Sequence, residues 1–559
     1  MPPPTDGERL KLPETCLPPW TVGELPEPRP LSWRHWYRFI GPGLVMMGIQ
    51  IGGGEWLLGP DITARYGGGL MWIATLAIIF QVFYNIECGR YALYCGEPVF
   101  TGFLRCRPGP RFWMGVILLL NLAALIPGLS THGAAICAAL IRGRPPTEDD
   151  RFLVTTLAYV FLLGVSLPIF LGGKVFNMLQ AVMTVKVFAV LAFCLGMGLL
   201  FVDRENWANV LSGFLKFGTL PITAGEGRQT TVNLWTNWRS GGGWPDLSLE
   251  NIALIGAFAG YAGGGGLANA TYSNFVRDKG WGMGSRVGAI PSAVGGTSVS
   301  LSHLGEVFAI TPESLARWRG WWRYILTDQV LVWAPGCFMG MALPALLSLQ
   351  FAPHSNLDPK KLAWAQALIT ADGVRHDPRF SAGLAEWLWV LTLLVGLLVM
   401  LPSQMSIIDD FSRRWTDILW SGVARVRDSL QENAVGRIYY GILVLYVGWS
   451  LFCAWAFNTW GSPRLMTIVI ANLNNLAIGV TSFQVWWINR RLLPAPLRPR
   501  WFQEAGVLAC GVFYLLLAGL VFYAKQWPEL VDWCTEQLKQ WPYLVEWWTY
   551  LVKWRSGTP

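Results

Sequence analysis

Two runs of glycine lie inside apolar stretches of the sequence, and polar side chains follow each run. The first is followed directly by a carboxylate, and the second is followed by an amide. Each glycine costs about 1 kcal/mol relative to alanine inside a helix, so a helix that contains such a run is predicted to unwind there. Freed backbone carbonyls beside a carboxylate suit a hard cation or a proton. The predicted substrate-binding residues are Gly52, Gly53, Gly54, Glu55, Gly264, Gly265, Gly266, Asn269 and Asn475, with Glu55 as the candidate metal ligand.

Each of these residues also has a purely structural interpretation. Glycine runs allow helices to pack closely in membranes, and asparagine side chains form hydrogen bonds between helices. A carboxylate in the middle of a membrane must be paired, hydrated or metal-bound. Glu55 could therefore form a structural pair with Lys186, which interrupts another apolar stretch.

Four further residues are candidates for coupling transport to ion or proton movement. Lys186 lies in the middle of an apolar stretch, and His132 lies in another. Glu87 and Arg90 are spaced i,i+3, so they can pair on one helix face, which favours a structural role. A lysine buried in a span, such as Lys186, could stand in for a coupling ion, and this remains an analogy. A single histidine such as His132 is more often part of the packed interior.

The elements that position these residues are membrane-spanning helices. Of the 559 residues, 53% are hydrophobic and only 14% are charged, whereas soluble domains carry about 25% charged residues. With about 20 apolar residues per span, the sequence predicts an all-α polytopic membrane protein with eleven spans that requires a lipid bilayer. The predicted spans are 39–61, 66–95, 112–140, 152–172, 175–201, 250–277, 325–349, 386–408, 437–458, 465–488 and 504–524.

The glycine runs fall in spans 1 and 6, which open the first and second groups of five spans. Broken helices at corresponding places in two halves indicate a transporter built from inverted repeats. The sequence therefore predicts a 5+5 repeat, spans 1–5 over 39–201 and spans 6–10 over 250–488, plus one further span, with spans 1 and 6 unwound.

Lysine and arginine in short loops set the orientation, and they predict a cytoplasmic N-terminus and an extracytoplasmic C-terminus in a plasma or inner membrane. Residues 1–34 are rich in proline and are predicted to be a disordered cytoplasmic tail. The transporter domain is predicted over 35–524. Residues 525–559 contain tryptophan alternating with charged residues, which predicts amphipathic helices on the outer membrane surface; a twelfth span is the alternative.

The sequence gives no sign of enzymatic or nucleotide chemistry. It contains no Gly-x-x-x-x-Gly-Lys-Ser/Thr loop, and its ten cysteines show no metal-ligand spacing. No paired carboxylates or nucleophile and base stand out. We therefore predict no cofactor, no nucleotide and no nucleic-acid partner.

Several short motifs resemble those of the Nramp family of divalent metal transporters, which have a LeuT-like fold. The register runs without a gap from Gly41 to Trp72, and weaker similarity in span order extends over about 35–524. The motifs are Phe39-Ile40-Gly41-Pro42-Gly43, Arg65-Tyr66-Gly67, Leu70-Met71-Trp72, Gly89-Arg90, Cys95-Gly96 and Arg490-Arg491-Leu492.

The positions that bind metal in that family are altered here. The family's Asp-Pro-Gly-Asn motif in span 1 reads Gly52-Gly53-Gly54-Glu55, and its Met-Pro-His motif in span 6 reads Gly265-Gly266-Leu267. Its glutamine in span 10 appears as Asn475, and its acidic residues in span 3 fall near Pro127 and Ser130. The resemblance therefore implies the fold and a transport role, and it does not carry over manganese or iron chemistry.

These observations predict a secondary active transporter that moves a small cation, for example Mg²⁺ or Mn²⁺, by alternating access. Loss of both strong metal ligands opens space at the glycine runs, so a carrier of a small organic solute is the alternative within the same class. A membrane scaffold that kept the fold without transporting is the alternative from another class.

Overall fold

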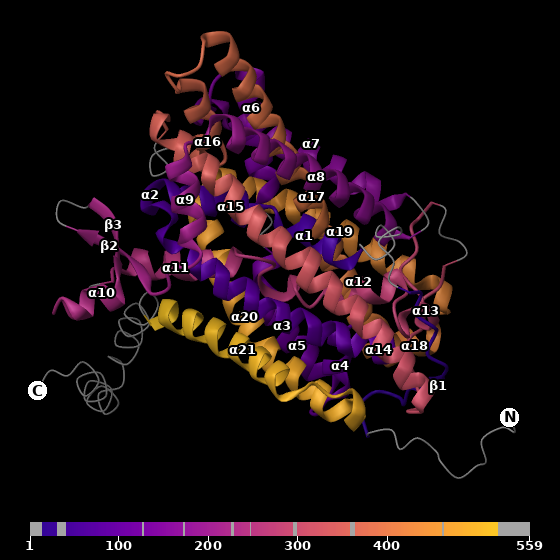
Figure 1. Ribbon diagram of the computed structural model, residues 1–559. Coiled ribbons are helices and arrows are strands. Elements are labelled where there is room, and N and C mark those ends of the chain that lie inside the picture. Colours follow the sequence, from indigo (N-terminus) through magenta and orange to yellow (C-terminus); the bar gives the residue numbers. More distant parts are fainter. Residues whose placement is uncertain are drawn as a thin grey trace, which may run out of the picture.

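The computed structural model describes residues 14–30, 41–125, 128–171, 174–224, 228–245, 247–294, 299–357, 364–460 and 463–523. Long helices run side by side through most of the molecule (Figure 1). Large apolar side chains remain exposed on their outer faces, for example Leu199, Leu445 and Leu516. An apolar exterior of this kind requires lipid, so the chain is a multi-pass α-helical membrane protein.

The first half of the chain contains an interrupted helix followed by four further spans. Its elements are α1 (Pro42–Gln50), a π-helical segment (Gly54–Leu58), α2 (Gly59–Tyr66), α3 (Met71–Cys95), α4 (Val99–Arg105), α5 (Pro110–Leu120), α6 (Leu129–Arg142), α7 (Arg151–Ser166) and α8 (Val175–Phe201).

The second half begins with the other interrupted helix. Its elements are α11 (Leu249–Tyr261), α12 (Tyr272–Lys279), α13 (Gly284–Val287), α14 (Pro312–Leu326), a π-helical segment (Thr327–Trp333), α15 (Ala334–Phe351), α16 (Ala365–His376), α17 (Ala382–Gly422), α18 (Ala424–Ser429), α19 (Val435–Trp460), α20 (Pro463–Leu492) and α21 (Trp501–Val521).

Within the described ranges, nine helical stretches are long and apolar enough to cross a membrane, whereas the sequence predicts eleven spans. The difference arises at predicted spans 1, 2 and 6. The first merges with the following span into one stretch, Gly54–Cys95. The second is divided into α11 and α12, which are each too short to be counted.

Loops at opposite ends of the helices carry additional structure (Figure 1). At one end, α9 (Arg204–Gly213) precedes an antiparallel hairpin of β2 (Thr219–Ala224) and β3 (Arg228–Asn233), and α10 (Leu234–Arg239) follows. At the other end, β1 (Thr21–Gly23) pairs in parallel with β4 (Glu306–Phe308). The fold is thus all-α in its spans, with two short two-stranded sheets outside them.

Residues 14–30, which fall within the segment 1–34 predicted to be disordered, lie against the helix ends and are called the strap below. Trp20 is buried, with its ring 4.4 Å from the guanidinium of Arg105. Trp321 and Tyr324 of α14 donate hydrogen bonds to the carbonyls of Pro26 and Arg29, at 2.8 and 2.7 Å. Apolar residues and free carbonyls within the proline-rich segment therefore fix it against the helix ends. Residues 1–13 and 31–34 lie outside the described residues.

Glu97 anchors the same end of the molecule. Its carboxylate accepts hydrogen bonds from the Nε of Arg105 at 2.8 Å and from the backbone N–H of Gly305 at 2.7 Å. Burial alone would raise the pKa of Glu97, but the Arg105 charge and these hydrogen bonds hold that pKa below its ordinary value.

Candidate functional site

Both glycine runs interrupt their helices and meet at one cavity. Regular α1 ends at Gln50, and the chain continues through a turn into the π-helical segment. α11 ends at Tyr261, and α12 begins only at Tyr272. A Cβ on Gly54 would lie 2.6 Å from the carbonyl oxygen of Tyr261, so the two interruptions touch where only glycine fits.

The second interruption is sealed by a side chain from α3. Gln81 donates to the carbonyl of Ala262 at 2.7 Å and accepts from the N–H of Gly264 at 2.7 Å and from the Nδ2 of Asn269 at 2.9 Å. Gly263 and Gly265 have φ values of 86° and 66°, which take the backbone out of the helix. Gln81 therefore supplies partners that the unwound backbone lost, and such partners are required at membrane depth.

Glu55 likewise supplies a hydrogen-bond partner to the backbone of the first interruption. One of its carboxylate oxygens, Oε2, accepts from the backbone N–H of Gly52 at 3.2 Å. The other, Oε1, is buried without a hydrogen-bond partner among the described residues. The first interruption differs from the prediction because Glu55 itself is π-helical, and the non-helical turn lies just before it.

Lys186 lies beside the same interruption. Its ammonium donates to the hydroxyl of Ser403 on α17, and that hydroxyl lies 3.5 Å from the carbonyls of Ile49 and Ile51. Lys186 thus places a positive charge against the end of α1.

The cavity between the interruptions has a volume of about 150 Å³. Its wall includes five residues expected from the sequence: Gly53, Gly54, Gly264, Gly265 and His132. The other predicted site and coupling residues are not part of the lining: Gly52, Glu55, Gly266, Asn269, Asn475, Lys186, Glu87 and Arg90.

Asn475 and the Glu87–Arg90 pair hold helices together away from the cavity. Asn475 donates to the carbonyl of Gly256 on α11 at 2.8 Å, whereas its neighbour Asn474 lines the cavity. Arg90 binds Glu87 at 2.9 Å and also donates to Gln503 on α21 at 2.8 Å. These contacts agree with the structural interpretation of the pair.

The sequence analysis missed an ion pair in the cavity wall. Asp410 and Arg414, four residues apart on α17, both line the cavity and bind each other. Arg414 also donates to the Oδ1 of Asn121 at 2.6 Å and to the hydroxyl of Thr271 at 3.2 Å. The signal in the sequence was the i,i+4 spacing of aspartate and arginine, which allows neutralisation within one helix.

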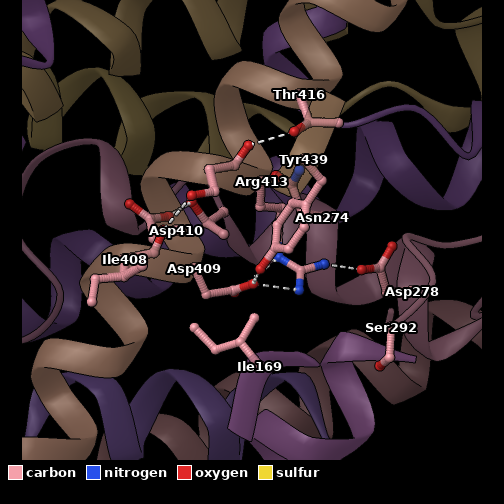
Figure 2. Close-up of polar contacts among 12 residues, drawn as sticks. Ile169, Asn274, Asp278, Ser292, Ile408, Asp409, Asp410, Arg413, Thr416 and Tyr439 are labelled. Atoms are coloured by element: carbon pink, nitrogen blue, oxygen red, sulfur yellow. Dashed lines mark hydrogen bonds and ion pairs between the residues drawn. The ribbon is translucent and has the colours of Figure 1, made fainter. Parts of the chain in front are cut away.

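The neighbouring ion pair on α17, between Asp409 and Arg413, has different partners. Arg413 binds Asp409 on its own helix and Asp278 on α12, and Figure 2 shows its guanidinium between the two carboxylates. Arg277 binds Asp278 at 2.8 Å and Asp417 at 2.5 Å. The predicted span 386–408 stops just before these charges, whereas α17 continues through them to Gly422. Each arginine is paired with an aspartate of the same helix, and Asp278 of α12 adds a second carboxylate for Arg413.

Among the described residues, no group of three or more histidine, cysteine, aspartate or glutamate side chains could hold a metal ion. The charged groups in the cavity wall are one aspartate and one arginine, and these two are paired with each other. The wall is otherwise built from glycine backbone, amides, the hydroxyl-bearing side chains of Ser403 and Tyr261, a histidine and apolar side chains.

The comparisons with known proteins show a likeness in fold to one transporter. No family model matches the sequence. The structure matches a mutant of the manganese transporter of Eremococcus coleocola with a TM-score of 0.59 and 12% sequence identity, covering 94% of this chain and 96% of that one. The same transporter in complex with an aromatic bis-isothiourea compound matches with a TM-score of 0.58, 11% identity and coverage of 98% and 97%.

One curated sequence is also similar, an uncharacterized protein of Pasteurella multocida. It is 29% identical over 143 residues, which are 26% of this chain and 31% of that protein. The aligned region therefore spans about a third of the curated relative. The similarity to the Nramp fold that was expected from the sequence is confirmed at the level of the fold. The chain is a multi-pass membrane protein whose fold resembles that of this manganese transporter.

Proposed function

We propose that the protein is a secondary active transporter that moves a small solute across the membrane by alternating access. The observation that supports this most strongly is the single cavity between two interrupted helices, one opening each half of the chain. Interrupted helices at corresponding places form the substrate sites of inverted-repeat transporters. The fold shared with a manganese transporter over 94% of the chain supports the same function.

Counterflow in proteoliposomes tests the transport function directly. Vesicles loaded with unlabelled solute are diluted into labelled solute, using a panel of Mn²⁺, Mg²⁺, acetate, lactate and alanine. A carrier gives a transient, saturable accumulation of at least one member. If no member shows protein-dependent counterflow, the proposed function is wrong.

A matched pair of glycine variants tests whether that flux depends on the cavity. A Cβ at Gly264 would lie 1.9 Å from the Oδ1 of Asn269 and 2.4 Å from the Nε2 of Gln50. A Cβ at Gly164 on α7 would meet no atom within 4 Å. We expect Gly264→Ala to reduce counterflow at least tenfold and Gly164→Ala to leave it unchanged. Equal flux in the two variants would argue against this cavity.

A small cation bound by Glu55 is the second candidate for the cargo. The Oε1 of Glu55, which has no hydrogen-bond partner among the described residues, supports it, because oxygen ligands suit Mg²⁺ or Mn²⁺. Under this hypothesis, Glu55→Gln lowers Mn²⁺ uptake without lowering the melting temperature, while the exposed control Glu148→Gln changes neither. A lowered melting temperature with normal uptake would make Glu55 structural.

A further inference from the structure

A groove opens on the outer side of the bundle where α11, α20 and α21 meet. α20 and α21 run antiparallel and touch at two levels: a Cβ on Gly479 would lie 2.8 Å from the Cγ of Leu515, and a Cβ on Gly511 would lie 2.6 Å from the ring of Phe483. One turn beyond Leu515, a Cβ on Gly519 would meet no described atom within 4 Å. The two helices therefore separate toward this end, and the groove has a volume of about 410 Å³.

α11 forms the third wall of the groove. A Cβ on Gly256 would lie 2.3 Å from the Oδ1 of Asn472 on α20 and 3.0 Å from the Cγ2 of Val521 on α21, so α11 packs against both helices at this level. Ala253, one turn earlier on α11, lines the groove. Leu476 of α20 also lines it and is exposed, so the groove is open toward the lipid.

The lining offers no free hydrogen-bond donor to a ligand. Asn472 is the only polar side chain among the described residues that line the groove. Its NH₂ group donates to the carbonyls of Ile468 at 2.9 Å and Ala253 at 3.3 Å, and its oxygen accepts from Asn475 at 3.5 Å. Water needs two to four polar partners to remain in a cavity, so this groove excludes water.

The location of the groove decides what fills it. An empty groove would deprive its lining of dispersion contacts. Its volume lies within the range of about 300–1,000 Å³ that is typical of ligand sites. α20 and α21 are both long and apolar enough to cross a membrane, and the solvent around such spans consists of lipid acyl chains rather than water.

The depth of the groove suits a chain that enters from one membrane surface. Its lining on α21 runs from Leu515 to Phe522, which is about 10 Å at 1.5 Å per residue. Val521 is the last residue of α21, and Ala253 lies in the second turn of α11, so the groove begins where these helices reach the membrane surface. The hydrocarbon of one leaflet is about 15 Å thick, so an acyl chain can lie in the groove over most of its length.

We infer that this groove binds one acyl chain of a membrane phospholipid by packing alone, without recognising the headgroup. α20 separates the groove from the cavity of the candidate site, since Leu473 and Leu476 line the groove whereas Ile470 and Asn474 line the cavity. A bound chain therefore supports α20 from the side opposite the cavity. The inference does not rest on the proposed transport function, because it concerns binding alone.

Gly519→Phe is the decisive variant, because its ring would occupy the space that the acyl chain takes. Gly164→Phe on α7 is the matched control, since a Cβ on Gly164 also meets no described atom within 4 Å and Gly164 lies outside the groove. Both glycines are exposed on the outside of the bundle, so a difference between the two variants reports on the groove.

The experiment is native mass spectrometry of the purified, delipidated full-length protein in detergent with added palmitoyl-oleoyl-phosphatidylcholine. We expect the wild type and Gly164→Phe to retain one lipid per chain, and Gly519→Phe to retain at least fivefold less. Palmitoyl-oleoyl-phosphatidylglycerol should bind within threefold of phosphatidylcholine. Glycerophosphocholine, which has the headgroup without the chains, should not compete. The melting temperatures of the lipid-free variants show whether both are folded.

Five outcomes would each overturn the inference. Three concern the lipid: equal retention by the two variants, competition by glycerophosphocholine, or a preference of more than threefold for one headgroup. A lipid-free Gly519→Phe that melts well below Gly164→Phe would show that part of the protein already fills the groove. A lipid-free dimer of the wild type that is lost in Gly519→Phe would show that a second copy fills it.

Discussion

Several buried charges in this protein are paired with oppositely charged side chains that are also buried. Glu97 and Arg105 illustrate this at the end of the molecule where the strap lies, because both side chains are within 3% of full burial and each satisfies the other. The pairs on α17 follow the same rule inside the helix bundle. A charge in such a place contributes to stability only while its partner remains ionised.

The lowered pKa of Glu97 predicts how the stability of the protein changes with acid. A carboxyl whose folded pKa is depressed contributes stability that is fully present above its unfolded pKa of 4.5 and is lost as the pH falls through the folded value. We expect the melting temperature of the wild type to fall below about pH 4.5.

Glu97→Gln should have a lower melting temperature at pH 7 and a weaker dependence on acid, since the titrating group is gone. The loss at pH 7 should be about 3–5 kcal/mol, because Arg105 is left without its counter-charge. The exposed control Glu148→Gln should follow the wild-type curve. Parallel pH curves for wild type and Glu97→Gln would contradict the assignment.

At the scale of elements, the interrupted helices depend on side chains from their neighbours. Gln81→Leu removes the donor to Ala262 and the acceptor for Gly264 while keeping a similar size. Each unsatisfied buried backbone group costs about 1–3 kcal/mol. We therefore expect a marked drop in melting temperature, measured by intrinsic fluorescence.

The control for this prediction is Gln431→Leu, at an exposed position between α18 and α19. If Gln81→Leu melts like that control, water or another side chain must form the hydrogen bonds to the unwound backbone, and Gln81 is not required to stabilise it.

The ion-pair chain between α12 and α17 gives a second prediction at this scale. Asp278 is shared by Arg277 and Arg413, so Asp278→Asn removes the negative charge between two buried guanidinium groups (Figure 2). Loss of one partner of a buried ion pair costs about 3–5 kcal/mol. The exposed control Asp149→Asn should have no effect, and equal melting temperatures of the two variants would contradict this role of Asp278.

Helices could be predicted from the sequence where a single local property, such as an unbroken apolar stretch, defines them. The span 175–201 coincides with α8, Val175–Phe201, because an unbroken apolar stretch with one lysine is sufficient to define it. The glycine runs likewise marked both interruptions. In contrast, the predicted span 386–408 stops where charges begin, whereas α17 continues to Gly422. Its continuation depends on Asp278 and Asn121, which are distant in sequence, and for the same reason Arg414 could not be recognised as part of the cavity wall.

At the scale of the whole molecule, the strap joins the two halves at one end. It contacts α4 through Arg105, which donates to the carbonyl of Pro18 at 2.8 Å, and it contacts α14 through Trp321 and Tyr324. The proposed alternating access requires the halves to move relative to each other. Under that proposal, the strap must either move with one half or open.

Removal of the two hydrogen bonds from α14 should loosen the strap without unfolding the bundle. In the double variant Trp321→Phe/Tyr324→Phe, two hydrogen bonds worth about 1 kcal/mol each are lost. We expect the amides of β1 and β4 to exchange with deuterium at least fivefold faster, measured by mass spectrometry, with unchanged exchange in the β2–β3 hairpin. Unchanged exchange in β1 would show that the sheet, rather than α14, holds the strap.

The pairing of β1 with β4 also has a consequence for the order in which the protein is made. The partners Thr21 and Glu306 are about 285 residues apart in the chain. At a synthesis rate of about 5–20 residues per second, the first strand waits roughly 15–60 s before its partner leaves the ribosome. The strap therefore closes only after the chain through α12 has been synthesised, so a protease or antibody that recognises residues 14–30 would distinguish nascent chains from chains in which β4 has been made.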